Sequence, residues 1–303
     1  MSPPFARVAI IGLGLIGSSL ARAVRLRMPD VVLSGQDRSP AVRQRVAELA
    51  LVDRLGADPA EAVRGCDLVI LAVPLGAMAD CLRAAAPALE PGAVITDVGS
   101  SKQSVLEALA PLVPEGRHLV PAHPVAGTEQ SGPDAGFATL FEGRWAILTP
   151  PANADGNAVA RLADFWRALG SRVDLMDARH HDLVLAVTSH LPHLIAYSIV
   201  GTASDLEDVT KAEVIKYSAG GFRDFTRIAA SDPTMWRDVF LMNREAVLEI
   251  LARFSEDLAA LQRAIRWGDG ETLFRRFEAS RAIRRAIIDA GQDTAEPDFG
   301  RTH

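Results

Sequence analysis

Two polar residues lie at the C-terminal ends of apolar runs that are typical of buried strands. His123 lies at the end of LVPAHP (119–124), and Ser100 closes AVITDVGS (93–100). A histidine at the end of a strand, followed by Pro124, is held firmly and could accept a proton while a hydride leaves the same substrate carbon. Ser100 on the neighbouring strand end could orient that ring. The alternative is a histidine whose ring binds the backbone of its own loop.

A glycine-rich loop near the start of the chain indicates a nucleotide site. Gly12 ends the apolar run VAIIG (8–12), and Gly14 and Gly17 lead into a helix expected over 18–27. Gly12 permits a tight turn, Gly14 lets backbone approach a pyrophosphate, and Gly17 lets helix and strand pack closely. The alternative is a plain turn that binds nothing. The dinucleotide contacts that we expect are Gly12, Gly14, Leu15, Ile16, Gly17, Asp37, Arg38, Val73, Pro74 and Ser100.

Asp37 bears on which dinucleotide is bound. It lies just beyond the second predicted strand, VVLSG (31–35), at the position where an acid can bond a ribose 2′-hydroxyl. A carboxylate there repels a 2′-phosphate, so the pattern favours NAD over NADP, although the adjacent Arg38 softens that preference. Alternatively, Asp37 simply caps the helix that follows it.

The second half of the chain holds further polar groups with open roles. His190 and His193 share one helix face, which suits a metal pair, but no cluster of further ligands accompanies them, and we expect no metal. An arginine in the glycine-rich stretch GGFRDFTR (220–227) could hold a carboxylate with two hydrogen bonds. A surface salt bridge is the alternative for that arginine.

The elements that must position these residues change character near residue 178. Before it, short apolar runs alternate with helical patterns, which predicts an α/β fold with a Rossmann-type, doubly wound, mostly parallel sheet. After it, we expect a helix over 178–201 bent at Pro192, an irregular segment near 218–232 and helix to about residue 290. The sequence therefore predicts a dinucleotide-binding domain at 1–177 and an all-α domain at 178–303.

An apolar seam runs through the last helical region. Its members step by four and three, which suits either a core face or a subunit interface. The seam consists of Val247, Leu251, Phe254, Leu258, Leu261 and Ile265.

Composition excludes several classes of protein. The 303 residues are 49% hydrophobic, which excludes a disordered chain, and a net charge of −6 gives no attraction to nucleic acid or anionic membranes. Cys66 and Cys81 cannot form a disulfide framework, which fits the cytoplasm. The uncharged stretch from Leu183 to Ser204 is long enough to span a bilayer, yet its histidines and proline favour a buried helix of a soluble protein.

Five motifs together resemble one family, the prephenate and arogenate dehydrogenases of tyrosine biosynthesis. The resemblance extends from about residue 7 to about residue 265, and the order and spacing of the motifs make it specific. The motifs are GLGLIGSSLA (12–21), DVGSSK (97–102), HPVAGTEQSG (123–132), SHLPH (189–193) and GGFRDFTRIAASDPTMW (220–236).

The resemblance implies a reaction. A hydride passes from the hydroxyl-bearing ring carbon of prephenate to NAD, the hydroxyl proton passes to a base, and CO2 leaves as the ring becomes aromatic. Arogenate reacts in the same way and gives tyrosine. By resemblance, His123 is the catalytic histidine and Ser100 bonds both that histidine and the substrate. The residues expected to bind substrate are Arg227, His193, Glu129, Thr128, Asp224 and Trp236.

The resemblance also implies a homodimer formed by the helical domain, which the seam would serve. We expect no regulatory domain of the kind that some relatives have, and we therefore expect any inhibition by tyrosine to act at the active site. The residues do not determine whether the substrate is prephenate or arogenate.

Two other functions compete with this one. A hydroxyacid dehydrogenase or imine reductase would use Lys211 or Lys216, but it leaves HPVAGTE and SHLPH unexplained. The second alternative is a nucleotide-binding sensor or scaffold that catalyses no reaction. The joint presence of His123, Ser100 and Arg227 argues against it.

Overall fold

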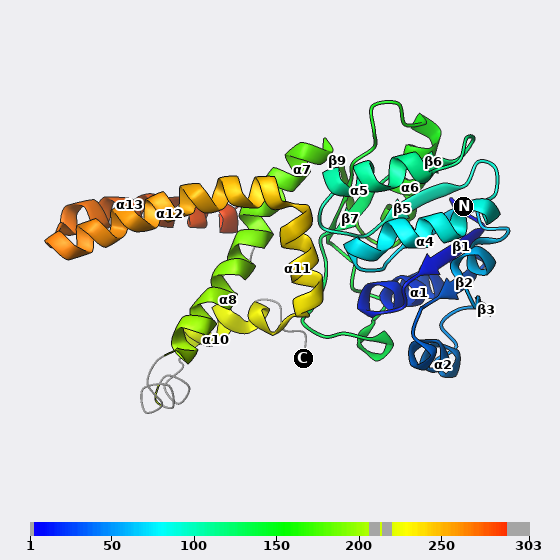
Figure 1. The fold of residues 1–303 in the computed structure, drawn as a ribbon, viewed down its shortest axis with the longest axis horizontal. Coiled ribbons are helices and arrows are strands. Elements are labelled where there is room, and N and C mark those ends of the chain that lie inside the picture. The colour runs from blue at the N-terminus through cyan, green and yellow to red at the C-terminus, as the bar shows by residue number, and fades with distance from the viewer. Residues whose placement is uncertain (1–2, 206–212, 214–219, 290–303) are drawn as a thin grey trace. The chain divides into compact units, whose positions relative to one another are not determined.

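The computed structural model describes residues 3–205, 213 and 220–289 (Figure 1). The chain divides into two compact units, Met1–Val247 and Leu248–His303. The first unit holds both sheets and all the candidate site residues. The boundary predicted after residue 177 falls inside this unit, where alternating strands and helices give way to helices alone. As a boundary between domains it stays a prediction.

The larger sheet has six parallel strands in the order β3-β2-β1-β4-β5-β6, which confirms the predicted doubly wound fold. Its strands are β1 (Arg7–Ile11), β2 (Val32–Gln36), β3 (Arg54–Leu55), β4 (Leu68–Leu71), β5 (Val94–Asp97) and β6 (His118–Leu119). The intervening helices are α1 (Leu15–Arg27), α2 (Pro40–Glu48), α3 (Pro59–Val63), α4 (Met78–Ala85) and α5 (Gln103–Leu109). The strand order reverses between β1 and β4, and sheets of this kind bind ligands at the carboxyl ends of the strands beside such a point.

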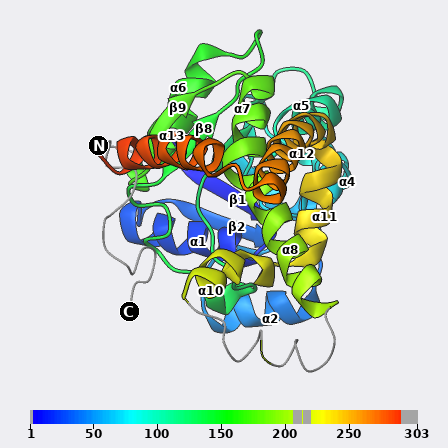
Figure 2. The same cartoon turned by 90° about the vertical axis from the view of Figure 1, so that its left-hand side faces the viewer.

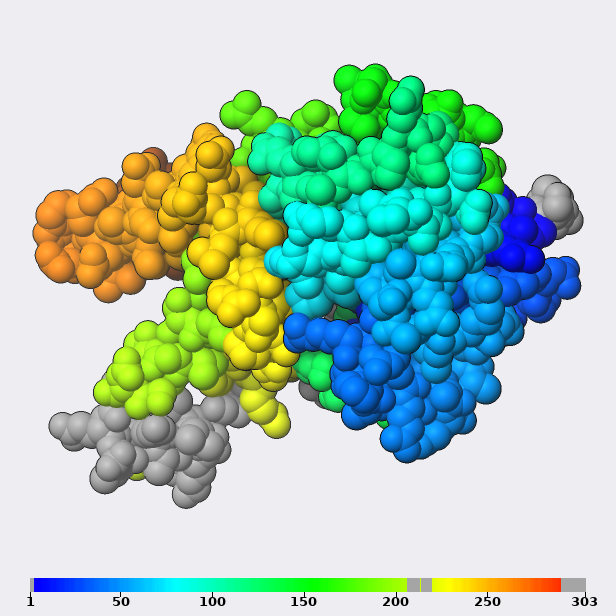
Figure 3. Space-filling view, turned by 45° about the vertical axis from the view of Figure 1, so that its right-hand side comes forward, coloured from blue at the N-terminus to red at the C-terminus, as the bar shows by residue number. Residues whose placement is uncertain are grey.

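Both faces of the large sheet are buried. Val8 and Ile10 of β1 pack into one apolar cluster with α1 and α6 (Gly156–Ala168), whereas Ala9 and Ile11 pack into another with α4 and α5. The second cluster also contains Trp236 and Val239 of α11 (Pro233–Met242). Figure 3 shows α11, in yellow, against the cyan surface of α4. The all-helical part of the first unit is thus joined to the sheet through a shared core.

A smaller sheet corrects the prediction of one strand over 119–124. In the structure β6 ends at Leu119, and β7 (Ala122–Pro124) pairs instead with β8 (Trp145–Leu148) in a second sheet completed by β9 (Arg172–Leu175). Pro121 separates the two strands and has no N–H to continue the first ladder. His123 therefore lies inside an antiparallel strand, opposite Ile147.

The predicted helix over 178–201 is interrupted. It forms α7 (Ala178–Leu185), a π-helical turn over Ala186–His190 and α8 (Leu191–Ser204). The interruption comes just before Pro192, whose nitrogen cannot donate to the preceding turn.

The structure corrects two further expectations for the second half. Within the segment predicted to be irregular, residues 220–226 form helix α10 (Gly220–Thr226), which packs against α8 (Figure 2). The helical run predicted to about residue 290 is broken, because Gly268 has φ +67° and Asp269 caps the next helix through the N–H of Thr272. This leaves α12 (Arg244–Trp267) and α13 (Gly270–Asp289).

The stretch Ala178–Ser204 is long and apolar enough to cross a membrane by length and composition, and 28% of its most apolar window is buried in the structure. This burial is lower than the sequence led us to expect. His181, Asp182 and His190 are buried on the side that packs against the rest of the unit, whereas Val187 and Ile199 are exposed. Hydrogen-bonded charged and polar groups on the packed side are unlike a lipid-facing helix.

A buried ion pair ties the two sheets together. Lys102 Nζ contacts Asp97 Oδ2 at the end of β5 and donates to the carbonyl of Ala122 in β7 at 2.9 Å. Asp97 also accepts from the N–H of Gly99 at 2.8 Å, and both charged side chains are fully buried. Because Ala122 directly precedes His123, this pair fixes the backbone that carries the histidine.

We expect Lys102→Met to destabilise the fold by about 3–5 kcal/mol, since it leaves the Asp97 carboxylate buried without its cation. The free energy of unfolding in urea, measured at pH 7, checks this. Arg83→Met, which removes the exposed partner of Asp80 in α4, is the matched control and should leave the midpoint unchanged. Equal midpoints for the two variants would contradict the structural role of the buried pair.

Candidate active site

The glycine loop between β1 and α1 has the geometry that a dinucleotide needs. Gly12 has φ +94°, and a Cβ there would lie 2.4 Å from the carbonyl oxygen of Ala72. A Cβ on Gly17 would lie 1.9 Å from the carbonyl oxygen of Gly12, so strand and helix meet too closely for any side chain. At Gly14, by contrast, nothing lies within 4 Å of the Cβ position. The backbone at Gly14 is therefore open to a phosphate group at the start of α1.

Asp37 supports this loop. Its carboxylate accepts from the N–H of Leu13 at 2.9 Å and from the N–H of Ser39 at 2.9 Å. The side-chain cap of α2 comes from Ser39, through Val42, rather than from Asp37. Each oxygen of Asp37 keeps a second lone pair, so the group can still accept from a ribose hydroxyl.

Five of the other predicted dinucleotide contacts follow the carboxyl ends of β1, β2 and β4. Leu15 and Ile16 form the first turn of α1, Arg38 is exposed after β2, and Pro74 follows β4. The Cγ1 atom of Val73 lies 2.9 Å from the Cβ position of Gly12. The residues predicted from a single motif and from two strand ends thus converge on the β1–β4 switch point.

His123 is buried and has a partner that sequence reasoning missed. Its Nδ1 lies 2.9 Å from Nε2 of His181 in α7, and His181 Nδ1 lies 2.8 Å from Asp182 Oδ1. Burial lowers the pKa of His123 well below its usual value, and the nearby His181, Lys102 and His190 lower it further. At neutral pH the ring is therefore a neutral base. The expected partner, Ser100, is half-buried after β5 and takes no part in the contact at Nδ1.

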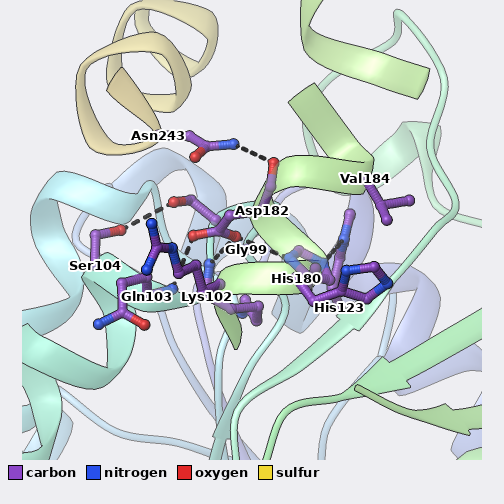
Figure 4. Close-up of polar contacts among 12 residues, drawn as sticks. Gly99, Lys102, Gln103, Ser104, His123, His180, Asp182, Val184 and Asn243 are labelled. Atoms are coloured by element: carbon purple, nitrogen blue, oxygen red, sulfur yellow. Dashed lines mark hydrogen bonds and ion pairs between the residues drawn. The ribbon is translucent and has the colours of Figure 1, made fainter. Parts of the chain in front are cut away.

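Asp182 is the junction of this cluster. It accepts from the backbone N–H groups of Lys102 at 2.7 Å and Gln103 at 2.9 Å, at the start of α5. In Figure 4 Asp182 lies between Asn243, the start of α5 and His123. The sequence did contain a signal, because Asp182 is the last charged residue before the uncharged stretch and follows His181 directly.

The π-helical turn places His190 in the interior. Asn243 Nδ2 donates to the carbonyl of Asp182 at 2.8 Å and contacts His190 Nδ1 at 3.1 Å. Burial lowers the pKa of His190 to about 4. His190 Nε2 is buried with no hydrogen-bond partner among the described residues. The contact with Asn243 occupies Nδ1 of His190, so this ring joins α11 to the π-helical turn.

His193 and Trp236, both predicted to bind substrate, stack on each other. Their ring centroids are 3.6 Å apart with 23° between the planes. His193 Nδ1 donates to the carbonyl of Ser189 at 2.8 Å, which leaves Nε2 as the free ring nitrogen. Burial lowers the pKa of His193, and the charge of Arg227 lowers it further.

Arg227 and Glu129, also predicted to bind substrate, form an ion pair. Arg227 Nη1 lies 3.0 Å from Glu129 Oε2, and 53% of the arginine side chain is exposed. Thr128 is exposed beside Glu129, and Asp224 is exposed on α10 one turn before Arg227. Segments nearly a hundred residues apart in the sequence thus meet at this pair.

A chain of contacts joins these groups. It leads from His123 through Asp182 to Asn243 and His190, and the His190 ring lies 6.0 Å from Trp236. Within the described residues no three His, Cys, Asp or Glu side chains are grouped to hold a metal ion. A neutral buried base, an aromatic stack and a partly exposed guanidinium, with a dinucleotide loop on the same unit, define the class of dinucleotide-dependent dehydrogenases.

Comparison with known families identifies the chain. A family model for the nucleotide-binding domain of prephenate dehydrogenase matches residues 20–175, and one for the prephenate dehydrogenase dimerization domain matches residues 177–279. The chain therefore belongs to the prephenate dehydrogenase family and is an oxidoreductase of tyrosine biosynthesis.

Individual relatives agree over nearly the whole chain. Cyclohexadienyl dehydrogenase from Zymomonas mobilis is 48% identical over 93% of this chain and 96% of its own length. Prephenate dehydrogenase from Bacillus subtilis is 33% identical over 92% of this chain and 76% of its own length. The crystal structure of prephenate dehydrogenase from Aquifex aeolicus, in complex with hydroxyphenyl propionate and NAD+, superposes with a TM-score of 0.86 at 31% identity. That match covers 95% of this chain and 98% of the other.

The burial of His190 predicts a stability that depends on pH. Its pKa of about 4 in the fold lies below its ordinary value of 6.5, so below pH 6.5 the unfolded chain binds a proton that the folded chain refuses. The free energy of unfolding is therefore unaffected by His190 protonation above pH 6.5 and decreases as the pH falls towards 4. In His190→Asn the amide oxygen can replace Nδ1 as acceptor towards Asn243. This variant has no imidazole to protonate, so about 3 kcal/mol of the decrease in the free energy of unfolding should be absent from it.

Urea unfolding at pH 7, 6, 5 and 4.5 measures both proteins. The difference in free energy of unfolding between wild type and His190→Asn should shrink as the pH falls through this window. Parallel curves would show that His190 is not held neutral by the fold.

Proposed function

We propose that this chain catalyses the NAD-dependent oxidative decarboxylation of prephenate, of L-arogenate, or of both, to 4-hydroxyphenylpyruvate or L-tyrosine. The observation that carries this assignment is the neutral, buried His123 in the same unit as a dinucleotide loop and a partly exposed arginine. The relatives named prephenate, cyclohexadienyl and arogenate dehydrogenase support both substrates.

The residues at the β1–β4 switch point fit NAD. When bound, NAD+ supplies the two-electron acceptor of the reaction. The open backbone at Gly14 suits the pyrophosphate, and the free lone pairs of Asp37 suit the ribose hydroxyls. The same carboxylate opposes a 2′-phosphate, which is why we propose NAD rather than NADP.

His123 acts as the base. Its Nε2 accepts the proton of the ring hydroxyl while the ring carbon that bears this hydroxyl loses its hydride. The proton returns to the oxygen when loss of CO2 makes the ring a phenol. The lowered pKa of His123 keeps that nitrogen unprotonated at neutral pH. Ser100, half-buried in the loop after β5, bonds the substrate hydroxyl.

Arg227 binds a substrate carboxylate, since its guanidinium is half-exposed and can form two parallel hydrogen bonds. The His193–Trp236 stack forms an apolar wall with a polar nitrogen, suited to a flat ring that carries polar groups. Glu129 contacts this guanidinium directly, and we assign the exposed Thr128 and Asp224, close to this pair in sequence, to the same part of the substrate site. L-Tyrosine carries the same amino-acid side chain as arogenate on a ring of similar size, so we propose that it competes at this same site.

The decisive test is turnover with prephenate and with L-arogenate, each with NAD+ and with NADP+, followed by absorbance of the reduced nicotinamide. We expect turnover with NAD+. His123→Asn should lower kcat by about 10²- to 10⁴-fold, since the base is lost while the amide can still reach His181.

NADH binding, measured by fluorescence, is the control and should be the same in wild type and His123→Asn. The preferred substrate then defines the specificity. Absence of turnover with either substrate and either cofactor would reject the assignment, and turnover that survives in His123→Asn would reject the role of the base.

We also propose a homodimer that works in the reducing cytoplasm, where the unpaired Cys66 and Cys81 are stable. Large apolar side chains of α12 and α13 are exposed in the single chain, which a second copy would cover. They include Leu258, Ile265, Trp267, Phe274 and Phe277. The match to a dimerization domain over residues 177–279 supports the same surface.

Sedimentation analysis should give twice the chain mass of 32.4 kDa. The double variant Phe274→Glu, Phe277→Glu should shift the protein towards monomer, because charges enter an apolar contact. Glu256→Lys, an exposed charge change on α12, is the control. A wild-type monomer at micromolar concentration would contradict the dimer.

A further inference from the structure

The histidine pair at the centre of the site fixes where protons can reside. His181 is fully buried and His123 is 7% exposed, and their rings meet edge to face with centroids 5.1 Å apart. His123 Nδ1 faces His181 Nε2 at 2.9 Å, and His181 Nδ1 faces Asp182 at 2.8 Å. The His123–His181 contact and the His181–Asp182 contact each need one donor and one acceptor.

Asp182 sets the direction of the chain. Its two oxygens already accept backbone N–H groups from Lys102 and Gln103, so the carboxylate acts as an acceptor towards every neighbour. His181 Nδ1 must therefore carry a proton and donate to Asp182. Burial lowers the pKa of His181, and nearby Lys102 lowers it further, against the opposing effect of Asp182 and Asp97. A neutral His181 has only one N–H, so its Nε2 is an acceptor.

The same count of donors and acceptors determines the tautomer of His123. Because His181 Nε2 accepts, His123 Nδ1 must donate, and a neutral His123 then has its lone pair at Nε2. The charged and titratable groups that surround the pair are Lys102, Asp97, Asp182 and His190. Lys102 is neutralised by Asp97, and His190 is neutral by its own burial, so neither supplies a proton to the pair.

We propose that His181 and Asp182 are positioning residues that hold His123 in the Nδ1–H tautomer, with Nε2 presented as the base. The inference rests on the proposed function, in which Nε2 of His123 takes the hydroxyl proton. The balance needs one transfer only: the substrate O–H bond breaks, an Nε2–H bond forms, and the Nδ1–H remains bonded to His181. The positive charge that develops on His123 is stabilised through His181 by the carboxylate of Asp182.

The anchoring of Asp182 makes this alignment rigid. The start of α5 holds its carboxylate, and Asn243 at the end of α11 holds its carbonyl. His181 is therefore fixed from α7, which packs against α5, and not by the strand that carries His123. A base aligned from a second element is held in one orientation before substrate arrives.

Two substitutions of His181 test the proposal. In His181→Leu, the Nδ1–H of His123 loses its acceptor, so the ring can turn or change tautomer. We expect kcat to fall about 10- to 100-fold, with KM and NADH binding unchanged. In His181→Gln, the side-chain carbonyl can accept from His123 Nδ1, and most of the lost kcat should return. His180→Leu, on the preceding exposed residue, is the matched control and should have wild-type kcat.

A second measurement does not depend on turnover. Protein labelled with ¹⁵N at histidine, with the His123 signals assigned from His123→Asn, reports the tautomer by NMR. Wild type and His181→Gln should show His123 protonated at Nδ1 only, and His181→Leu should show a mixture of tautomers. Thermal unfolding of each variant identifies loss of fold.

The outcomes separate the two proposals. Wild-type turnover together with undiminished kcat in a folded His181→Leu would overturn this inference and leave the proposed function intact. An Nε2–H tautomer of His123 in wild type would overturn it whatever the activity. No wild-type turnover with prephenate or arogenate would instead reject the proposed function, while the NMR result would still establish the hydrogen-bond direction.

Discussion

The carboxylate of Asp182 has to find its hydrogen-bond donors inside the protein, because only 4% of the residue is exposed. It finds them at the start of α5, whose first residues have no side-chain cap of their own, and on the adjacent His181. A buried carboxylate without such donors would cost several kcal/mol, so α7 cannot leave α5 without a large penalty. The packing of the helical segment on the sheet and the alignment of the candidate base therefore have one physical origin.

Lys102 extends this constraint to both sheets. Its backbone N–H serves Asp182, while its ammonium group serves Asp97 in the large sheet and the carbonyl of Ala122 in the small sheet. One residue thus joins three parts of the unit, and His123 follows Ala122 directly. In surroundings from which water is excluded, such bonds are stronger and less easily exchanged than at a surface. The site is consequently formed by the fold itself before any ligand binds.

The sequence was sufficient for the sheet and the dinucleotide loop, since both depend on local patterns. Buried parallel strands appear as continuous apolar runs, and Gly12 and Gly17 mark contacts too close for a side chain. The separate sheet of His123 was not predicted, because β7 pairs with β8 more than twenty residues away and nothing local distinguishes it from β6. His181 was missed for a similar reason: Asp182 and Lys102 are 80 residues apart, and their contact leaves no periodic trace. Helix α10 was missed because its two leading glycines resemble a loop, whereas packing on α8 stabilises it.

The ion pairs of the unit divide according to burial, and this division suits the proposed binding of a substrate anion. Lys102 and Asp97 are fully buried, so exchanging either partner for a ligand would expose an unpaired charge to the interior. Arg227 and Glu129 are partly exposed, and water screens the attraction between them. Under the proposed function, a substrate carboxylate competes with Glu129 for the guanidinium of Arg227 at little net cost, and a bidentate contact then adds geometric selection. The buried pair thus fixes the backbone that carries His123, and under the proposed function the partly exposed pair is the one that exchanges with substrate.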